Sequence, residues 1–431
     1  MPISGDIMEI IKNKVCGADI HKKFLVATIL SRDGTQISER FGMMLDDILK
    51  FKEWVIANNC EQVAIESTGV YWVPIYTALE DKIEVIVANP YQIKHTPGRK
   101  TDKVDSEWIA ELCLKGMIEP SRIFPKEDRE LRTLTRAREN LVNNRTQMKN
   151  RIHQILEYSC IKISSVLTDI FGKSGRYLLE CLLEGKSIDE ILIGTKSKTI
   201  RKNEKQLREA IKNSLDPAQI LVIRYYLEQM EEIQKKLDNL DTEIMSRLER
   251  MREDLEIAMS IPGIAFTSAS SILAEIGNYR DFENGNKLAA WCGLVPSIYE
   301  SANKRIMGSI TKQGSKHVRR MLVQVAHAIS RTRNSRLKSF FLRIKAKKGT
   351  KVAIVALARK VLCILHHLLV NREMYEETVD LKPKPLKFDR TSSPIQITEQ
   401  DMIDALTKAG YIIEKKDKGG GSGGGYSTPL S

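Results

Sequence analysis

A hydrophobic repeat in residues 216–255 constrains the fold of this 431-residue chain more than any other feature. Asp216 and Pro217 are typical of a helix start, an N-cap followed by Pro at the first helical position. Behind them, apolar residues recur every three or four positions over about five heptads, which is the spacing of a coiled-coil seam. The seam comprises Ile220, Ile223, Leu227, Met230, Ile233, Leu237, Leu240, Ile244, Leu248, Met251 and Leu255. We expect an exposed arm that supports oligomerisation as a dimer or tetramer; the alternative is an antiparallel partner within the chain.

The positive charge of the chain is concentrated in residues 301–372. This segment has eighteen Lys and Arg residues and no Asp or Glu, whereas the whole chain has 68 basic and 55 acidic residues. The formal net charge of +13 is therefore a property of one region. A basic surface without acidic partners repels itself unless a polyanion neutralises it, and phosphate contacts release condensed counterions. We expect nucleic-acid binding here; the alternative is a solvated basic face.

Composition narrows the class of protein. At roughly 100–200 residues per domain, the length allows two or three domains. No apolar run reaches the roughly 18 residues of a membrane span, and the first residues lack the apolar region of a signal peptide. The seven Cys residues contain no C-x-x-C pair, so we expect reduced, mostly buried thiols rather than a zinc site. These features favour a cytoplasmic protein without a membrane partner.

Residues 14–90 have the pattern of an α/β domain. The stretches KVCGADI, FLVATIL and QISERFG predict three successive strands, and Asp33-Gly34 is a hairpin signal. A helix at 44–58 follows, then the short apolar strand VAIEST, a second helix and the strand IEVIVANP. This order is that of an RNase H-like domain, an inference that rests on pattern alone.

Most of the remaining chain reads as helical. A basic helix at 126–158 either tracks a phosphate backbone or has a solvated face, and short helices are expected over 160–215. Ile261-Pro262-Gly263-Ile264 predicts a turn between two helices, either a phosphate-binding helix-hairpin-helix element or a plain helical hairpin. GGGSGGG at 419–425 has the composition of a flexible linker.

Four acidic residues stand out by their positions. Asp19 and Glu66 lie at the ends of two predicted strands, while Asp102 and Asp105 lie three apart at a helix start. The first and fourth strands are neighbours in an RNase H-like sheet, so Asp19 and Glu66 are expected side by side. Clustered carboxylates raise one another's pKa unless a cation neutralises them. Hard oxygen ligands suit Mg²⁺ or Mn²⁺, and two such ions can clamp a phosphodiester.

Short motifs in both halves of the chain resemble one known family. In the first half they are Gly17-x-Asp19-x-x-Lys22, Glu66-Ser67-Thr68-Gly69, Asn89-Pro90 and Lys100-Thr101-Asp102-x-x-Asp105. In the second half they are Ile261-Pro262-Gly263-Ile264, Ala274-Glu275-Ile276-Gly277, Gly293-Leu294-Val295-Pro296, Ile310-Thr311-Lys312-x-Gly314 and Arg319-Arg320. Their order and spacing over roughly residues 14–370 resemble the IS110 family of DEDD insertion-sequence transposases.

The resemblance implies a fold and a domain layout. It implies a RuvC-like, RNase H-fold domain at 14–125 that carries the four acids, followed by a helical and coiled-coil region at 126–258. A mostly helical transposase domain with a nucleophilic serine would occupy 259–375, with an extension at 376–418 and a tag-like tail at 419–431. It also implies a nucleoid-associated protein in a prokaryotic cytosol, bound to donor DNA, target DNA and a bridge RNA encoded by the element.

The residue that matches the family's serine is Ser301, which Ala302 follows where the family typically has Gly. Ser297 and Ser309 are nearby competitors. The nearest His in sequence is His317, so a Ser–His dyad is not supported. We expect the acids and Mg²⁺ to activate the serine, and basic side chains to neutralise the phosphate. The predicted nucleic-acid-binding residues are Lys304, Arg305, Lys312, Lys316, Arg319, Arg320, Arg331 and Arg333.

The leading interpretation is a DNA recombinase that forms a covalent Ser301–DNA intermediate. One alternative is a metal-dependent RuvC-like nuclease, such as a Holliday-junction resolvase, in which Ser301 is structural. Another is a non-catalytic protein that packages nucleic acid. Substitution of Ser301 distinguishes the first two, and substitution of Asp102 or Asp105 tests the third.

Overall fold

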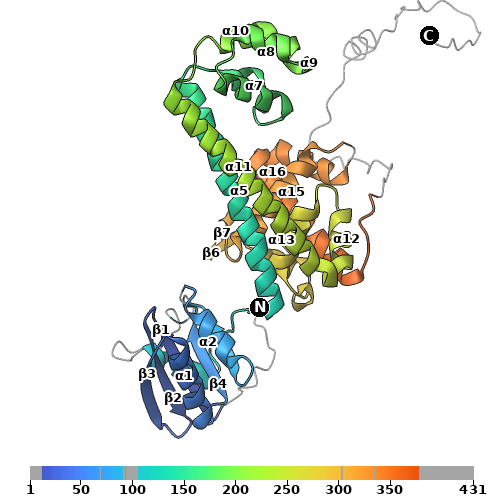
Figure 1. The fold of residues 1–431 in the computed structure, drawn as a ribbon. Helices are drawn as coiled ribbons and strands as arrows, with labels where there is room; N and C mark the ends of the chain where they lie inside the picture. Colours follow the sequence, from blue (N-terminus) through green and yellow to red (C-terminus); the bar gives the residue numbers. More distant parts are fainter. Residues whose placement is uncertain are drawn as a thin grey trace, which may run out of the picture. The chain divides into compact units, whose positions relative to one another are not determined.

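The protein is described here by a computed structural model that covers residues 12–67, 69–90, 93, 105–301, 304–333 and 335–377, with the backbone alone for 298–301 and 304–307. The predicted extension at 378–418 and the tail at 419–431 lie outside the described residues, as does Asp102. Figure 1 shows an α/β part at the N-terminal end, a long pair of helices and a mainly helical C-terminal part. This agrees with an α/β region followed by a mainly helical one.

The N-terminal part is built on one five-stranded sheet with the order β3-β2-β1-β4-β5. Its strands are β1 (Lys14–Ile20), β2 (Phe24–Ser31), β3 (Gln36–Gly42), β4 (Gln62–Glu66) and β5 (Glu84–Ala88). The first three form antiparallel pairs, while β4 runs parallel to both β1 and β5. The expectation that the first and fourth strands are neighbours is therefore confirmed.

Helices cover both faces of this sheet. Side chains alternate between faces along a strand, and one set packs against α1 (Leu45–Ala57) and α2 (Trp72–Leu79). The other set packs against α4 (Asp105–Leu114). The contact with α4 is close: a Cβ added to Gly17 would lie 2.2 Å from the Ala110 backbone nitrogen. Only glycine at position 17 allows α4 to lie this near to β1.

The predicted seam lies on α11 (Pro217–Leu248), which packs along α5 (Lys126–Tyr158) (Figure 1). The two helices are antiparallel, because Arg138 pairs with Asp241 whereas Glu130, earlier in α5, pairs with Arg247, later in α11. The buried seam residues are Ile223, Leu227, Met230, Ile233, Leu237, Ile244 and Leu248. The alternative of an antiparallel partner within the chain is thus what the structure shows, and oligomerisation stays a prediction.

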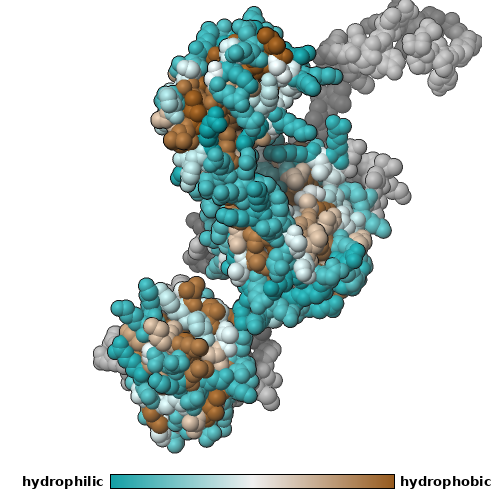
Figure 2. Space-filling view, viewed as in Figure 1, coloured by the Kyte–Doolittle hydropathy of each residue, from teal (hydrophilic) through white to brown (hydrophobic). Residues whose placement is uncertain are grey.

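The seam is shorter than the sequence indicates. A 3₁₀ turn, η1 (Glu249–Met251), ends α11, and α12 (Arg252–Ser260) follows. Met251 and Leu255 therefore lie beyond α11, where they pack against the C-terminal core and against the cluster of Leu131, Ile244 and Leu248. Figure 2 shows that the visible surface of the middle of the helix pair is hydrophilic, as expected for a pair that buries one stripe.

Short helices close the far end of the helix pair, as predicted for 160–215. They are α6 (Ile163–Val166), α7 (Lys173–Leu183), α8 (Ile188–Gly194), α9 (Lys198–Lys202) and α10 (Glu204–Ala210). Their apolar residues form one core with Ile152 and Leu156 of α5 and Ile223 and Leu227 of α11.

The C-terminal part has one large core. Its helices are α12, α13 (Phe266–Ile276), α14 (Gly285–Trp291), α15 (Lys316–Arg331) and α16 (Arg336–Asn371), with a 3₁₀ turn, η2 (Tyr279–Asp281). The predicted turn at Pro262-Gly263 does separate two helices, α12 and α13. Within α16, one stretch is long and apolar enough to cross a membrane, but 56% of it is buried inside the protein, as in a core helix.

The cysteines are free, and five of the seven are buried. Burial raises the pKa of the Cys113 and Cys292 thiols to about 12. Thiols of this kind are uncharged at neutral pH and pack as small apolar groups. The expectation of unpaired, mostly buried cysteines is confirmed.

The register of the helix pair can be tested by charge reversal at Arg138 and Asp241, whose side chains form two hydrogen bonds of 2.5 and 2.9 Å. We expect Arg138→Glu or Asp241→Arg to lower the melting temperature of the full chain by about 2–5 °C. The double variant should regain most of this loss, because the pair is restored in reverse. The exposed pair Arg252–Glu256 within α12 is the control, and Arg252→Glu should shift the melting temperature by less than about 1 °C. A double variant no more stable than the worse single variant would contradict this register.

Candidate functional site

Two of the predicted acids lie side by side at one edge of the large sheet. Glu66 is the last residue of β4, and Asp19 is the penultimate residue of β1. The two strands are parallel with Ala18 opposite Ile65, so the next residues in register are Asp19 and Glu66. Gly17 and Gln62 face α4, and alternation places Asp19 and Glu66 on that same face.

The third acid, Asp105, begins the helix that covers this face. The next residue, Ser106, shares a 2.8 Å hydrogen bond with Thr28, which lies opposite Gly17. Farther along α4, Cys113 donates to Gln62 at the start of β4. The helix thus runs from the carboxyl ends of β1 and β4 towards their beginnings, and its N-terminus lies at the edge that carries Asp19 and Glu66.

The chemistry of these residues fits a hard divalent cation, but the side chains do not form a metal cluster in this conformation. Among the described residues, no three His, Cys, Asp or Glu side chains are grouped so as to hold a metal ion. The Asp19 carboxylate instead lies 3.0 Å from Nε2 of His21. Asp19, Glu66 and Asp105, from three adjoining elements, carry the carboxylate oxygens that Mg²⁺ prefers as ligands. The fourth predicted acid, Asp102, lies outside the described part of the chain.

The predicted serine lies on a different sheet. Ser301 ends β6 (Pro296–Ser301), which pairs with β7 (Lys304–Ile310) in a two-stranded hairpin, with Ser301 opposite Lys304. The sequence analysis did not predict this hairpin. The competitors lie in the same hairpin, where the Ser297 hydroxyl donates to the Ser309 carbonyl at 3.0 Å. The serine and the acids therefore belong to different sheets.

The base of this hairpin, which we define as residues 291–295 and 311–315, is tightly packed. A Cβ on Gly293 would lie 2.3 Å from the Gln313 carbonyl oxygen, and one on Gly314 would lie 2.1 Å from that of Trp291. Backbone bonds from Thr311 to Val295 and from Lys312 to Gly293 close the ladder. The two chain segments approach so closely that neither glycine has room for a side chain.

Arg319 on α15 binds this hairpin base. Its guanidinium donates to the carbonyl oxygens of Cys292 at 3.1 Å, Gln313 at 2.6 Å and Gly314 at 3.1 Å. A guanidinium presents several donors in a rigid plane, so one side chain can hold three carbonyls. Arg319 was predicted to bind nucleic acid, and in this structure it positions the hairpin.

A buried carboxylate, Glu275 of α13, connects the hairpin base to α5. Glu275 is 1% exposed, and its oxygens accept from Arg136 at 2.6 and 3.0 Å and from Arg132 at 3.3 Å. Ser315 donates to it at 2.7 Å and also caps the first turn of α15. Burial alone would raise the pKa of Glu275, but the hydrogen bonds from Arg136 and Ser315 and the charge of Arg132 lower it below its ordinary value.

A second polar cluster lies between α5 and α15. Glu139 accepts from Nδ1 of His317 at 2.7 Å and pairs with Arg320, which donates to Asn143 at 2.7 Å. Of the predicted nucleic-acid-binding residues, Arg320 thus joins two helices, whereas Lys312, Lys316, Arg331 and Arg333 are exposed. The side chains of Lys304 and Arg305 lie outside the described atoms.

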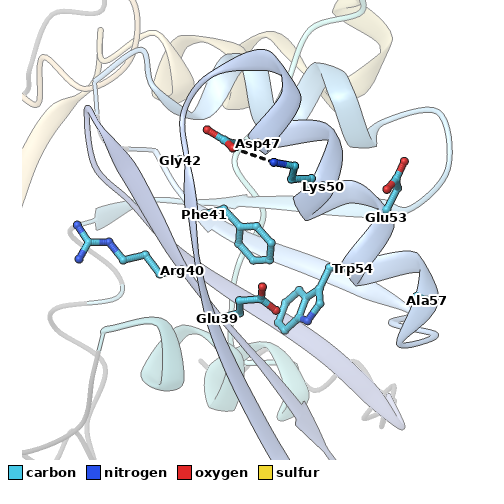
Figure 3. A pocket seen from close by; sticks show the side chains of 9 residues that line it. All are labelled: Glu39, Arg40, Phe41, Gly42, Asp47, Lys50, Glu53, Trp54 and Ala57. Carbon is cyan, nitrogen blue, oxygen red and sulfur yellow. Dashed lines mark ion pairs between the residues drawn. The ribbon is translucent and has the colours of Figure 1, made fainter.

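A pocket of about 550 Å³ lies on the other face of the large sheet, between β3 and α1 (Figure 3). Phe41 and Trp54 line it, with ring centroids 5.3 Å apart, together with Glu39, Asp47 and Lys50. Phe41 packs on the α1 side of the sheet, whereas Asp19 and Glu66 lie on the α4 side. This pocket is therefore separate from the acidic edge.

Comparison with known families gives the same order of parts. A family model for DEDD transposases of the IS110 kind, described as a transposase, matches residues 16–161. A second, described as a transposase of the IS116/IS110/IS902 family, matches residues 255–342. Together they cover more than half of the chain. The chain belongs to the IS110 family of transposases.

Curated relatives agree with this assignment. The transposase for insertion sequence element IS1111A of Coxiella burnetii is 25% identical over 67% of this chain and 71% of its own length. A probable family 20 transposase of Pseudomonas aeruginosa is 26% identical over 73% of this chain and 85% of its own. The pilin gene-inverting protein of Moraxella bovis is 24% identical over 84% of this chain and 98% of its own. The protein is accordingly a DNA transposase or recombinase.

In this transposase the Glu275 cluster joins the two matched regions, because Arg132 and Arg136 belong to the first and Glu275 and Ser315 to the second. From the sequence, Glu275 was identified only as part of the motif Ala274-Glu275-Ile276-Gly277, without a role of its own. An acid inside the apolar run Ile272–Ile276 was the available signal, since an isolated charge is rarely buried unless it is paired.

Glu275→Gln should destabilise the protein by about 1–3 kcal/mol, because it removes the charged acceptor that the half-buried Arg132 and Arg136 share. The pKa of Glu275 is lowered in the folded state from its ordinary value of 4.5. The stabilisation that ionised Glu275 gives the folded state is therefore complete above about pH 4.5, and it is lost as the pH falls through the folded-state pKa. Urea unfolding at pH 7, 5 and 4 should show a flatter acid dependence for Glu275→Gln than for the wild type. The exposed Glu209, paired with Lys212, is the control, and Glu209→Gln with the same effect would contradict a special role for Glu275.

Proposed function

We propose that this transposase cuts and rejoins DNA strands through a covalent bond between Ser301 and a strand end, assisted by a RuvC-like site of Asp19, Glu66, Asp102 and Asp105. The observation that carries the proposal is the meeting of three elements at one sheet edge. Asp19 and Glu66 lie at the carboxyl ends of neighbouring parallel strands, and Asp105 begins the helix on the same face. Family membership supports the assignment of these acids and of the serine.

The proposed step conserves the number of phosphate ester bonds. The Ser301 hydroxyl oxygen attacks the scissile phosphorus, its proton passes to a nearby carboxylate, and the bond to one deoxyribose oxygen breaks. That oxygen takes up a proton and becomes a free hydroxyl at the other strand end. Attack of a hydroxyl from a second strand on the serine ester reverses the chemistry, so rejoining needs no external energy source.

The four acids would hold one or two Mg²⁺ or Mn²⁺ ions. When bound, such ions stabilise negative charge on the phosphate oxygens and lower the pKa of a coordinated hydroxyl. The contribution of the chain itself is to place the donors: β1 and β4 fix Asp19 and Glu66 in register, and the close packing at Gly17 fixes the start of α4.

Basic side chains near the hairpin would neutralise the phosphates. Lys312, Lys316, Arg331 and Arg333 are exposed and can reach a backbone, and Lys304 and Arg305 precede them on β7. Arg319 and Arg320 act indirectly in this proposal, because their guanidinium groups hold the hairpin base and α5. Removing either should lower catalysis through misplacement of Ser301 more than through loss of affinity.

The active site is split in this proposal, since the acids and Ser301 lie on separate sheets. Donor DNA, target DNA and a bridge RNA would bring the two parts together, within one chain or between two subunits of a dimer or tetramer. A split site has a functional advantage: strand cleavage takes place only in the assembled complex. The relative named as a pilin gene-inverting protein supports a rearrangement of DNA as the outcome.

Ser301→Ala should abolish a trapped protein–DNA adduct and lower recombination by at least about 10³-fold, because no other group replaces the nucleophile. The assay uses full-length protein co-expressed with the DNA that flanks its gene, followed by denaturing gels and sequencing of junctions and bound RNA. Ser297→Ala and Ser309→Ala are matched controls in the same hairpin and should retain the adduct. Cleavage that persists in Ser301→Ala would instead favour a metal-only nuclease.

Asp105→Asn should lower the rate of strand cleavage by roughly 10²–10⁴-fold while leaving DNA affinity unchanged, since the amide keeps the shape of the side chain but loses its charge. Asp128→Asn on α5 is the control, because Asp128 pairs with Arg250 away from the acidic edge. Cleavage should also require added Mg²⁺ or Mn²⁺ after treatment with a chelator. Full recombination by Asp105→Asn would refute the acidic site and support a non-catalytic role.

A further inference from the structure

Helix α16 contains a projecting turn that we call the α16 elbow, residues 345–352. Leu337 and Phe341 are buried and Ile344 is half-buried, which is the stripe that anchors the start of the helix. The eight residues that follow are all exposed, and burial resumes at Ala353. At Gly349 the backbone leaves the helical conformation, with φ of 80° and ψ of 169°. The chain therefore leaves the core at Lys345, bends and returns at Ala353.

The elbow carries four lysines and no acid: Lys345, Lys347, Lys348 and Lys351. None of the four forms an ion pair with a residue that the structure describes. Lys345 lies 6.0 Å from the Phe341 ring, a contact that leaves its charge uncompensated. Lys345 and Lys348 are three positions apart, and such like-charged neighbours destabilise a helix. The elbow is thus unfavourable in isolation, and a polyanion would relieve the repulsion.

The arginines in the first half of α5 provide the contrast. Arg129 pairs with Glu80, Arg136 with Glu275, and Arg138 with Asp241. Their charges are used within the protein, so a basic helix in the sequence is not by itself a phosphate-binding surface. The lysines of the elbow are the opposite case, because they are exposed, adjacent and unpaired within the described chain.

We propose that the α16 elbow is a clamp for the phosphate backbone of nucleic acid, separate from the hairpin residues and used irrespective of base sequence. Lysine is a flexible point charge that suits phosphates, and the elbow lacks the planar Arg, Asn and Gln side chains that make rigid bidentate contacts with base edges. Its remaining residues are Ala346, Gly349, Thr350 and Val352. The inference rests on the proposed action on nucleic acid and adds a contact surface beyond the catalytic hairpin.

The test compares two variants with the same change in charge. The elbow variant carries Lys345→Gln, Lys347→Gln, Lys348→Gln and Lys351→Gln. The control variant carries Lys115→Gln, Lys162→Gln, Lys186→Gln and Lys212→Gln, four lysines that each pair with a carboxylate. Binding of the full-length chain to a 30-base-pair random duplex and to a random hairpin RNA is measured by fluorescence anisotropy at several NaCl concentrations.

The elbow variant should reduce the salt dependence of binding to the duplex by about three to four units of slope, since each phosphate contact contributes about 0.9. Affinity at 0.1 M NaCl should fall roughly 10-fold or more on the same argument. The control variant should change neither quantity by as much, and a Lys-to-Arg version of the elbow should retain the wild-type slope. A loss confined to the duplex or to the RNA identifies which phosphate backbone the elbow holds.

An unchanged slope on both probes, or an equal loss in the control variant, would overturn the clamp. This result is distinguishable from failure of the proposed function. If the wild type forms the Ser301-dependent adduct while the elbow variant binds normally, the clamp is wrong and the recombinase stands. If the salt dependence of binding falls in the elbow variant while no Ser301-dependent adduct forms, the clamp is supported and the serine chemistry is not.

Discussion

Glu275 is a carboxylate that is 1% exposed, and its burial is unfavourable unless charges and donors surround it. Arg132 and Arg136 of α5 and Ser315 at the start of α15 supply them. The same arginine-bearing helix also binds the N-terminal part through Arg129 and Glu80. Because a buried pair tolerates little displacement, α5 has a defined position on α13 and α15, and the hairpin that carries Ser301 is held from its base.

Pairing gives the basic residues different roles even where their sequence context is similar. The sequence shows a basic helix at 126–158 and a basic stretch at 301–372, and the charge count alone treats them alike. In the structure, arginines of α5 meet carboxylates from α11 and α13, which come from distant parts of the chain. The stretch 301–372 contains no acid of its own, so fewer carboxylates lie near its basic residues. The lysines of the α16 elbow, which belong to this stretch, are exposed. Whether a cation is available for phosphate is thus set by tertiary contacts.

Much of the fold follows from local patterns. Strand boundaries at 14–20 and 36–42 were predicted because apolar alternation and the Asp33-Gly34 turn act over a few residues, and Asp216-Pro217 marks the start of α11. The partner of the seam was not predictable, because a heptad repeat specifies an apolar stripe but not what covers it. The hairpin at 296–310 was missed because its strands contain few apolar residues, with Lys304 and Gly308 among those of β7.

The candidate site divides in the same way. Asp19 and Glu66 could be paired from sequence, because parallel neighbouring strands bring their carboxyl ends to one edge. Ser301 could be matched only by family motifs, since no local pattern distinguishes it from Ser297 or Ser309. The contacts that hold its hairpin, from Arg319 and Ser315, depend on elements brought together by folding. The proposed site, assembled from two sheets, would depend on the rigidity of each half. The contacts of the Glu275 cluster fix the hairpin base that leads to Ser301, while the packing of Gly17 against α4 fixes the acidic edge.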